Sequence, residues 1–252
     1  TWPEEVQSLA HDFLCRPMHV QVGDPSALSA NEDIRQQVLM LGSSEEKDDA
    51  LVRVLRSSAA PASERVLIFV AMKRQCDFVA RMLRKQGFSA DTMHSDKDQQ
   101  QREEALRRFR SGATPVLVAT DVAARGLDVK GVSLVVNYDS ASSAEDHVHR
   151  IGRTGRAGER GRSVTLLTKS GEDAWKAVGI AEVMEKAGCP VPPEMRLVVD
   201  RVLERRERAK VNDRKWEDLP KVLMVAEKPS VCKLIAEHLS GGRMRFRKGQ
   251  SR

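Results

Sequence analysis

VLIFV, at residues 66–70, opens the stretch of sequence that decides the fold. Four more short runs follow it along the chain: SADTM (89–93), PVLVAT (115–120), SLVVNY (133–138) and SVTLLT (163–168). Continuous runs of this length, rich in Val and Leu, are typical of strands buried on both faces of a sheet. Helix-like stretches at 73–87 and 97–112 lie between the runs, and each ends in Gly after basic residues. The alternation predicts a parallel sheet covered by helices.

The helix predicted at 73–87 carries one apolar stripe at helical spacing, formed by Phe78, Val79, Met82 and Leu83. A stripe of this kind is typical of the side of a helix that packs against the core.

The composition indicates a globular protein. Of 252 residues, 40% are hydrophobic and 31% are charged, which excludes a collagen-like or low-complexity chain. No run approaches 18 apolar residues, so no membrane-spanning helix is predicted. The four cysteines form no C-x-x-C pair, so neither a disulfide framework nor a metal site is predicted. The chain begins at Thr1 without a basic-then-apolar leader, and we expect a fragment without a signal peptide.

The positive charge is concentrated at the C-terminal end. Residues 1–200 carry 27 Lys and Arg against 29 Asp and Glu, a net charge of −2, whereas residues 201–252 carry 15 against 7, a net charge of +8. A basic end of this kind can attract nucleic acid phosphates, and single-stranded DNA is one candidate partner. Charge alone indicates a solvated helix face equally well.

The string HRIGRTGRAG at 149–158 is the strongest functional signal. Arg150, Arg153 and Arg156 recur every third residue, so a helix or tight turn would place them near one face. Arginine grips phosphate oxygens with two parallel hydrogen bonds and can neutralise charge that develops on a transferred γ-phosphate. We expect this string at the rim where the ligand-binding loops of the sheet gather.

A second string, VLVATDVAARGLDV at 116–129, predicts a ligand-binding loop. A buried strand ends at Thr120, Asp121 is placed to cap a short helix, and Gly126 allows a sharp exit. Loops at the carboxyl ends of parallel strands bind ligands, and amides at a helix start can hold phosphate. Asp128 could accept a hydrogen bond from a ribose hydroxyl. An ordinary capped strand–helix turn remains the alternative for this segment.

In this order the two strings resemble motifs V and VI of the second lobe of a DEAD-box RNA helicase. LIFVAMK (67–73) looks like motif IV of that family, HSDKDQQQR (94–102) looks like its block ending in a Gln-x-x-Arg pair, and TWPEEV at the start looks like the end of motif III. The resemblance covers about residues 1–190 and implies a RecA-like lobe. It is closest to the nuclear subgroup that acts on RNA duplexes and ribonucleoproteins, so a nuclear or cytoplasmic location is expected, the nuclear one preferred.

The resemblance also implies roles for individual residues. Arg153 and Arg156 match the arginine fingers that reach ATP across the cleft between two lobes, and His149 and Arg150 match residues that couple motifs and lobes; these four form the expected catalytic set. Asp128, beside Gly126, matches the ribose contact. The expected contacts with the RNA backbone are Thr120, Asp121, Arg125, Gln99 and Arg102.

Four positions depart from the family pattern. Ser95 stands where Gly is usual, Ser140 and Ala141 replace an aromatic–Pro pair, and His147 replaces an aromatic residue. We expect His147 to be a tolerated surface residue rather than a ligand.

Two motifs that hydrolysis of ATP requires are absent from this sequence. No Gly is followed by Lys, as a P-loop requires, and no Asp is followed by Glu, as the magnesium-holding motif requires. In the family both belong to the first lobe. We therefore expect ATP with magnesium to bind only in an intact two-lobed protein, and this chain alone to hydrolyse ATP negligibly.

A strand–helix pattern at 222–242, VLMVAEKPSVCKLIAEHLSGG, resembles the start of the Toprim domain of topoisomerase III. Glu227 would match the acidic residue that assists strand cleavage there. No Asp follows Glu227, and the only tyrosine is Tyr138, so no topoisomerase activity is expected. The junction is either a real fusion or two merged genes.

These observations predict four segments: the end of lobe one and a linker (1–34), the RecA-like lobe (35–190), a charged helical linker (191–219) and a truncated Toprim start (220–252). Two other functions remain open at this point. One is a non-catalytic nucleic-acid-binding module, and the other is a fragment of a type IA DNA topoisomerase.

Overall fold

A computed structural model describes residues 10, 12–14, 30–57, 65–124, 131–156 and 158–217, with side chains through residue 209. The chain divides into two compact units, Thr1–Glu204 and Arg205–Arg252. The sheet belongs to the first unit, together with the helical residues up to Glu204 that cover it. Most of the segment expected as the end of lobe one and a linker (1–34) falls outside the described residues, and the Toprim-like unit at 220–252 lies wholly outside them.

Six parallel strands form one sheet in the order β1-β6-β5-β2-β4-β3. Their bounds are β1 Ile34–Leu41, β2 Arg65–Phe69, β3 Ala90–Met93, β4 Val116–Ala119, β5 Val132–Asn137 and β6 Gly161–Thr168. Each of the five apolar runs forms one of these strands, which confirms the predicted parallel sheet. Because β4 is hydrogen-bonded to β3 on one side and to β2 on the other, the loops that follow these three strands leave the same edge of the sheet.

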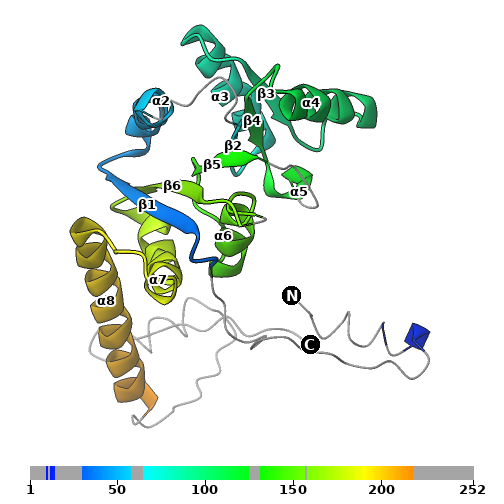
Figure 1. Cartoon of the computed structure of the whole chain (residues 1–252). Coiled ribbons are helices and arrows are strands. Elements are labelled where there is room, and N and C mark those ends of the chain that lie inside the picture. The colour runs from blue at the N-terminus through cyan, green and yellow to red at the C-terminus, as the bar shows by residue number, and fades with distance from the viewer. Residues whose placement is uncertain are drawn as a thin grey trace, which may run out of the picture. The chain divides into compact units, whose positions relative to one another are not determined.

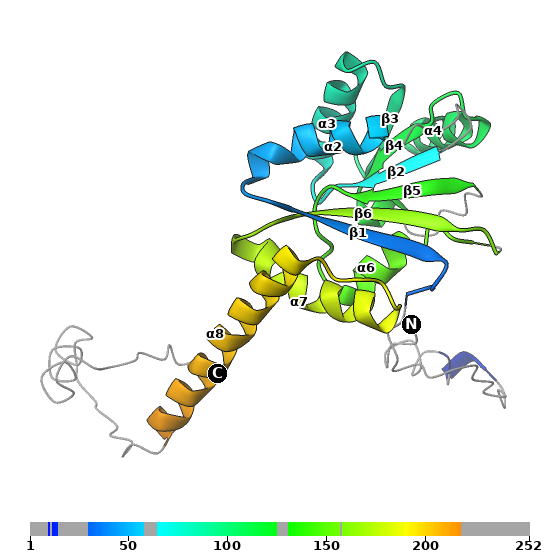
Figure 2. The same cartoon turned by 60° about the vertical axis from the view of Figure 1, so that its left-hand side comes forward.

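Helices cover both faces of the sheet (Figures 1 and 2). Their bounds are α2 Lys47–Ser57, α3 Lys73–Lys85, α4 Gln99–Ser111, α5 Asp121–Ala124, α6 Ala144–Ile151, α7 Gly171–Lys186 and α8 Pro193–Glu217, with a 3₁₀ turn at Ser44–Glu46 before α2. Gly112 ends α4 in the left-handed conformation, with a φ of 78°, as the glycine after basic residues predicts.

Alternation of side chains along the strands divides the core into layers. On β2, Val66 and Ile68 pack with α2 and α3 on one face, whereas Leu67 and Phe69 pack with α4 and α5 on the other. A third cluster joins β1 and β6 to α7 and α8. Burial on both faces explains why the central strands are continuous apolar runs instead of alternating ones.

Two features of this fold differ from the sequence analysis. The strand β1 and the helix α2 precede the first apolar run that the analysis recognised; β1 reads IRQQVLML, and its polar start hides the strand pattern. On α3 the predicted apolar stripe is partly wrong. Cys76, Val79 and Leu83 are buried, whereas Phe78 is 53% exposed. Successive helix residues are turned by about 100°, so only one of the two adjacent apolar rows meets the sheet.

The expectation that His147 lies at the surface is wrong. His147 is 1% exposed, because it lies on the side of α6 that faces the sheet. Its Nε2 lies 3.4 Å from Gln36 Oε1 on β1. Burial, together with the nearby charge of Arg150, lowers the pKa of His147 to about 4. The ring is therefore neutral at physiological pH.

In the part of the chain that the structure describes, no helix combines the length and the apolar composition that are needed to cross a membrane.

The buried imidazole predicts a loss of stability in mild acid. In the unfolded chain His147 takes up its proton near pH 6.5, whereas in the folded domain it does so only near pH 4. Between these values the unfolded state binds more protons, so the free energy of unfolding falls as the pH is lowered, by up to about 3 kcal/mol. Urea unfolding from pH 7 to pH 4.5 measures this slope. In His147→Phe the slope between pH 6.5 and 5 should be smaller, and an unchanged slope would show that another group is responsible.

Candidate functional site

The arginine string begins on α6, which starts with a side-chain cap. The hydroxyl of Ser143 accepts a hydrogen bond from the amide of Asp146, and the acidic Glu145 and Asp146 occupy the first turn. Acidic residues near a helix start and basic residues near its end both stabilise the helix. The helix ends at Ile151, so it carries His149 and Arg150 in its last turn, while Arg153 and Arg156 lie in the turns that follow.

Arg150 is the buried centre of the site. It is 3% exposed, and its guanidinium binds both carboxylate oxygens of Asp121, with Nε–Oδ1 and Nη2–Oδ2 distances of 2.6 and 2.7 Å. Its Nη1 donates to the backbone carbonyl of Asp139 at 2.6 Å and lies 3.4 Å from Asn137 Oδ1. The guanidinium also lies over the ring of Phe69, 5.1 Å from its centroid. This geometry stabilises a buried cation, because both carboxylate bonds are charge-assisted and Nη1 finds two further acceptors.

The ion pair joins the two motif strings of the sequence. Asp121 is the first residue of α5, directly after β4, and its carboxylate binds Arg150. The expectation that Asp121 caps a short helix is therefore replaced by a cross-link between α5 and α6. Since Arg150 uses both oxygens of Asp121, a contact of this carboxylate with RNA would have to share them. Thr120, one residue earlier, is half-buried at the end of β4, where its carbonyl accepts the amide of Ala124 at 3.0 Å.

The three arginines do not share one face. Arg150 points into the domain, whereas Arg153 and Arg156 are half-buried at the surface. Arg153 Nε donates to the carbonyl of His149 at 3.1 Å, and Arg156 Nε donates to the carbonyl of Gly152 at 2.8 Å. Each of these outer side chains is thus folded back on the turn that precedes it.

The turn between the two outer arginines is anchored at the amino ends of the strands. The hydroxyl of Thr154 donates to the carbonyl of Val132, the first residue of β5, and the carbonyl of Gly155 accepts from the side chain of Asn31 at 2.8 Å. Gly155 has a φ of 65°, and a Cβ there would lie 2.6 Å from Ile34 Cγ1. Only glycine fits this turn. The expectation that the whole string lies at the carboxyl rim is therefore correct for Arg150 alone.

The expected RNA contacts Gln99 and Arg102 lie together at the start of α4. Asp98 caps this helix by accepting the amide of Gln101 at 2.8 Å. Gln99 is exposed and donates to Glu103 at 2.6 Å, and Arg102, one turn further on, is half-buried. Because α4 follows β3 and α5 follows β4, its neighbour in the sheet, these residues and Thr120 leave the same edge of the sheet.

The sequence analysis did not identify three residues that contact Arg150. Asn137, Asp139 and Phe69 all lie at or just beyond the carboxyl ends of β5 and β2. The available signal was the polar Asn137-Tyr138-Asp139 directly after an apolar strand, the position where ligand-binding and positioning residues gather.

Some expected site residues lie outside the described residues. These are Arg125, Gly126 and Asp128, which follow α5 in the sequence, and Glu227 in the Toprim-like unit. His149 is described and is exposed on α6. Among the described residues no three His, Cys, Asp or Glu side chains form a group that could hold a metal ion.

The buried pair predicts a large loss of stability when one partner is removed. Arg150→Met leaves the carboxylate of Asp121 and the carbonyl of Asp139 without their donor, and should lower the free energy of unfolding by about 3–5 kcal/mol. Urea denaturation of the purified chain measures this change. Arg107→Met is the matched control, because Arg107 pairs with Glu104 on the exposed side of α4 and its loss should change stability little. Equal effects of the two substitutions would contradict the role of the pair.

Comparisons with known sequences show which proteins this chain resembles. Residues 46–158 match the helicase conserved C-terminal domain. The chain is 46% identical over 196 residues to the ATP-dependent RNA helicase DBP2 of Meyerozyma guilliermondii, covering 77% of this chain and 34% of that protein. It is also 46% identical over 201 residues to the DEAD-box ATP-dependent RNA helicase 46 of Arabidopsis thaliana, covering 80% of this chain and 30% of that protein. The chain thus spans about a third of the length of these relatives.

Solved structures show the same likeness. The Escherichia coli DEAD-box protein SrmB, crystallised with the regulator of ribonuclease activity A, is 32% identical, with a TM-score of 0.54; the match covers 64% of this chain and 93% of the SrmB chain. The RNA helicase Prp28 of Chaetomium thermophilum, bound to ADP, is 36% identical over 78% of this chain and 46% of its own, with a TM-score of 0.58. Dbp5 of Saccharomyces cerevisiae, 24% identical with a TM-score of 0.63, shares the fold. The chain described here therefore carries the C-terminal RecA-like lobe of the DEAD-box family of RNA helicases.

Proposed function

We propose that this chain is the C-terminal half of an ATP-dependent RNA helicase that unwinds RNA duplexes or remodels ribonucleoproteins. The observation that carries the proposal is the bidentate pair of Arg150 and Asp121, which joins the start of α5 to the helix α6, directly before the turns that carry Arg153 and Arg156. In this role the two outer arginines reach ATP that a first lobe holds, and RNA binds along the carboxyl edge of the sheet.

The placement of Arg153 and Arg156 supports a role toward a partner lobe. They flank the tightly packed Gly155, so the backbone between them has little freedom, while both side chains reach the surface. A pre-positioned guanidinium stabilises charge on a transferred phosphoryl group without reorganisation during the reaction. The described residues provide no carboxylate cluster for magnesium, so in this proposal the first lobe holds the metal and the phosphates.

The RNA contacts proposed for this lobe are backbone contacts. Thr120, Gln99 and Arg102 follow the neighbouring strands β4 and β3, and Arg125 belongs to the same string as Thr120. Contacts with phosphate and sugar fix the position of a strand without reading its bases, which suits an enzyme that acts on many duplexes. The solved Dbp5 structure holds RNA and ADP BeF3, and its fold is the one found here.

Finer parts of the proposal rest on the sequence. These are the ribose contact of Asp128, the nuclear location, binding of single-stranded DNA by the basic C-terminal end, and the division of the chain at residues 34, 190 and 219. The Toprim resemblance at 222–242 likewise remains a prediction from the sequence, and the similar proteins named above support only the helicase part.

A chimera tests the function. The first lobe of the Meyerozyma DBP2 relative is joined to residues 30–217 of this chain, and phosphate release is measured with and without RNA. We expect RNA-stimulated ATP hydrolysis by the chimera and none above background by the chain alone. Arg153→Ala or Arg156→Ala should lower kcat by about 10³-fold, the scale of a lost arginine finger.

Arg160→Ala is the matched control, because Arg160 is an exposed arginine that lies just beyond the string, and its loss should leave kcat unchanged. Hydrolysis of ATP by the chain alone, insensitive to Arg156→Ala, would contradict the proposal. Salt-sensitive RNA binding without any ATP hydrolysis by the chimera would favour a non-catalytic binding module.

A further inference from the structure

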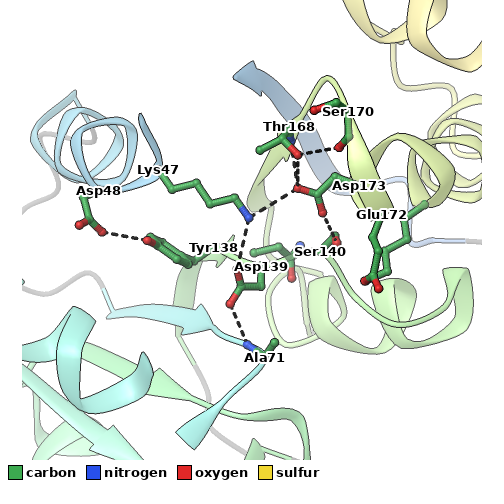
Figure 3. A network of polar contacts seen from close by, with 12 residues as sticks. Lys47, Asp48, Ala71, Tyr138, Asp139, Ser140, Thr168, Ser170, Glu172 and Asp173 are labelled. Carbon is green, nitrogen blue, oxygen red and sulfur yellow. Dashed lines mark hydrogen bonds and ion pairs between the residues drawn. The ribbon is translucent and has the colours of Figure 1, made fainter. Parts of the chain in front are cut away.

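A buried lysine outside every motif string lies at the centre of a polar network (Figure 3). Lys47 is the first residue of α2 and is only 6% exposed. Its ammonium lies 3.2 Å from Asp139 Oδ1 and 3.5 Å from Asp173 Oδ2, and 5.7 Å from the centre of the Tyr138 ring. The buried ammonium of Lys47 therefore forms ion pairs with two carboxylates, Asp139 after β5 and Asp173 on α7.

Asp139 connects this lysine to the candidate site. Its second carboxylate oxygen, Oδ2, accepts the amide of Ala71 at 2.9 Å, in the loop between β2 and α3. Its backbone carbonyl accepts Arg150 Nη1 at 2.6 Å. A single residue thus contacts Lys47, the β2–α3 loop and the arginine that binds Asp121. The carboxylate of Asp139 contacts Lys47 and Ala71, and its backbone carbonyl contacts Arg150, so a shift of the whole residue would change both contacts.

Asp173 holds the opposite side of the network. At the start of α7 its carboxylate accepts the amide and the hydroxyl of Thr168, each at 3.0 Å, and the hydroxyl of Ser140. Burial by itself would raise the pKa of Asp173, but these bonds and the charge of Lys47 hold it below its ordinary value. Asp173 is therefore ionised near neutral pH. Without Lys47, it and Asp139 would face each other as like charges.

We propose that Lys47 is a positioning residue, which holds Asp139 in the orientation that fixes both Arg150 and the β2–α3 loop. Stability alone does not account for such a residue, because a buried ion pair pays a desolvation cost that an apolar side chain of similar size avoids. The consequence for ATP hydrolysis rests on the function proposed above. The effect on Arg150 and Ala71 does not, because it is a property of the folded chain.

Three variants of the full chain test the proposal. Lys47→Met removes the charge and keeps the length of the side chain, and Lys47→Arg keeps the charge. Lys169→Met is the control, because Lys169 forms an ion pair with Glu194 that is half exposed and outside the network. The readouts are the hydrogen-exchange rate of the Ala71 amide, the ¹⁵N resonance of Arg150 Nε, and the midpoint of urea unfolding.

In Lys47→Met, the Ala71 amide should exchange at least about tenfold faster, the scale of one lost hydrogen bond to a charged group. The Arg150 Nε resonance should shift or broaden, whereas amides at the centre of β4 and β5 should keep their protection. Lys47→Arg should restore both signals, and Lys169→Met should match the wild type. If the exchange of Ala71 and the Arg150 resonance stay unchanged in Lys47→Met, the proposal is wrong. Equal acceleration at all amides would show a role in stability only, and would also overturn it.

If Lys47→Met does not fold, the double variant Lys47→Met/Asp173→Asn removes the repulsion between the carboxylates and still leaves Asp139 without its cation. The same changes at Ala71 and Arg150 are expected there, and their absence again contradicts the proposal.

The chimera described above separates this inference from the proposed function. There Lys47→Met should lower kcat while the KM for ATP changes little, because Lys47 acts through Arg150 and not on the nucleotide. A wild-type chimera without ATP hydrolysis would count against the proposed function alone. The exchange and resonance changes would still decide the role of Lys47. An active chimera in which Lys47→Met lowers neither kcat nor the protection of Ala71 would overturn that role.

Discussion

The ion pair of Arg150 with Asp121 is the interaction on which the rest of the site depends. A guanidinium that is 3% exposed needs an anionic partner and further acceptors, because an unpaired buried charge is costly. The acceptors come from three elements, since Asp121 begins α5, Asn137 ends β5 and Asp139 follows it. The hydrogen bonds of Arg150 therefore fix α6 relative to the segments that follow β4 and β5.

The three arginines of the string therefore differ in their contacts. Arg150 cross-links α6 to α5 and to the loop after β5, whereas Arg153 and Arg156 follow a helix whose position this cross-link determines. At its far end the string is held by Gly155, where the backbone packs against Ile34 too closely for any Cβ. The backbone of a segment fixed at both ends has little conformational freedom. In the proposed role, this would lower the entropic cost of binding a phosphate.

The network around Lys47 extends the same principle to the opposite face of the site. Asp139, in the loop after β5, accepts hydrogen bonds from both Arg150 and Ala71. It therefore links α6 to the loop that follows β2. Charges in such a network depend on each other in a medium of low polarity. The site is therefore supported by residues that carry no recognisable motif, and Lys47 and Asp173 are the clearest examples.

The sequence by itself determined five of the six strands, their parallel arrangement and the two motif strings. Those features depend on apolar runs, glycines and arginines that are contiguous in the chain, so local patterns report them. Only the tertiary structure decided that Arg150 is buried while Arg153 and Arg156 are not, that His147 lies in the core, and that Phe78 is exposed. It alone decided which distant residues, such as Lys47 and Asp139, meet. Burial and partnership of this kind depend on which faces of separate elements pack together, and spacing along one segment does not contain that information.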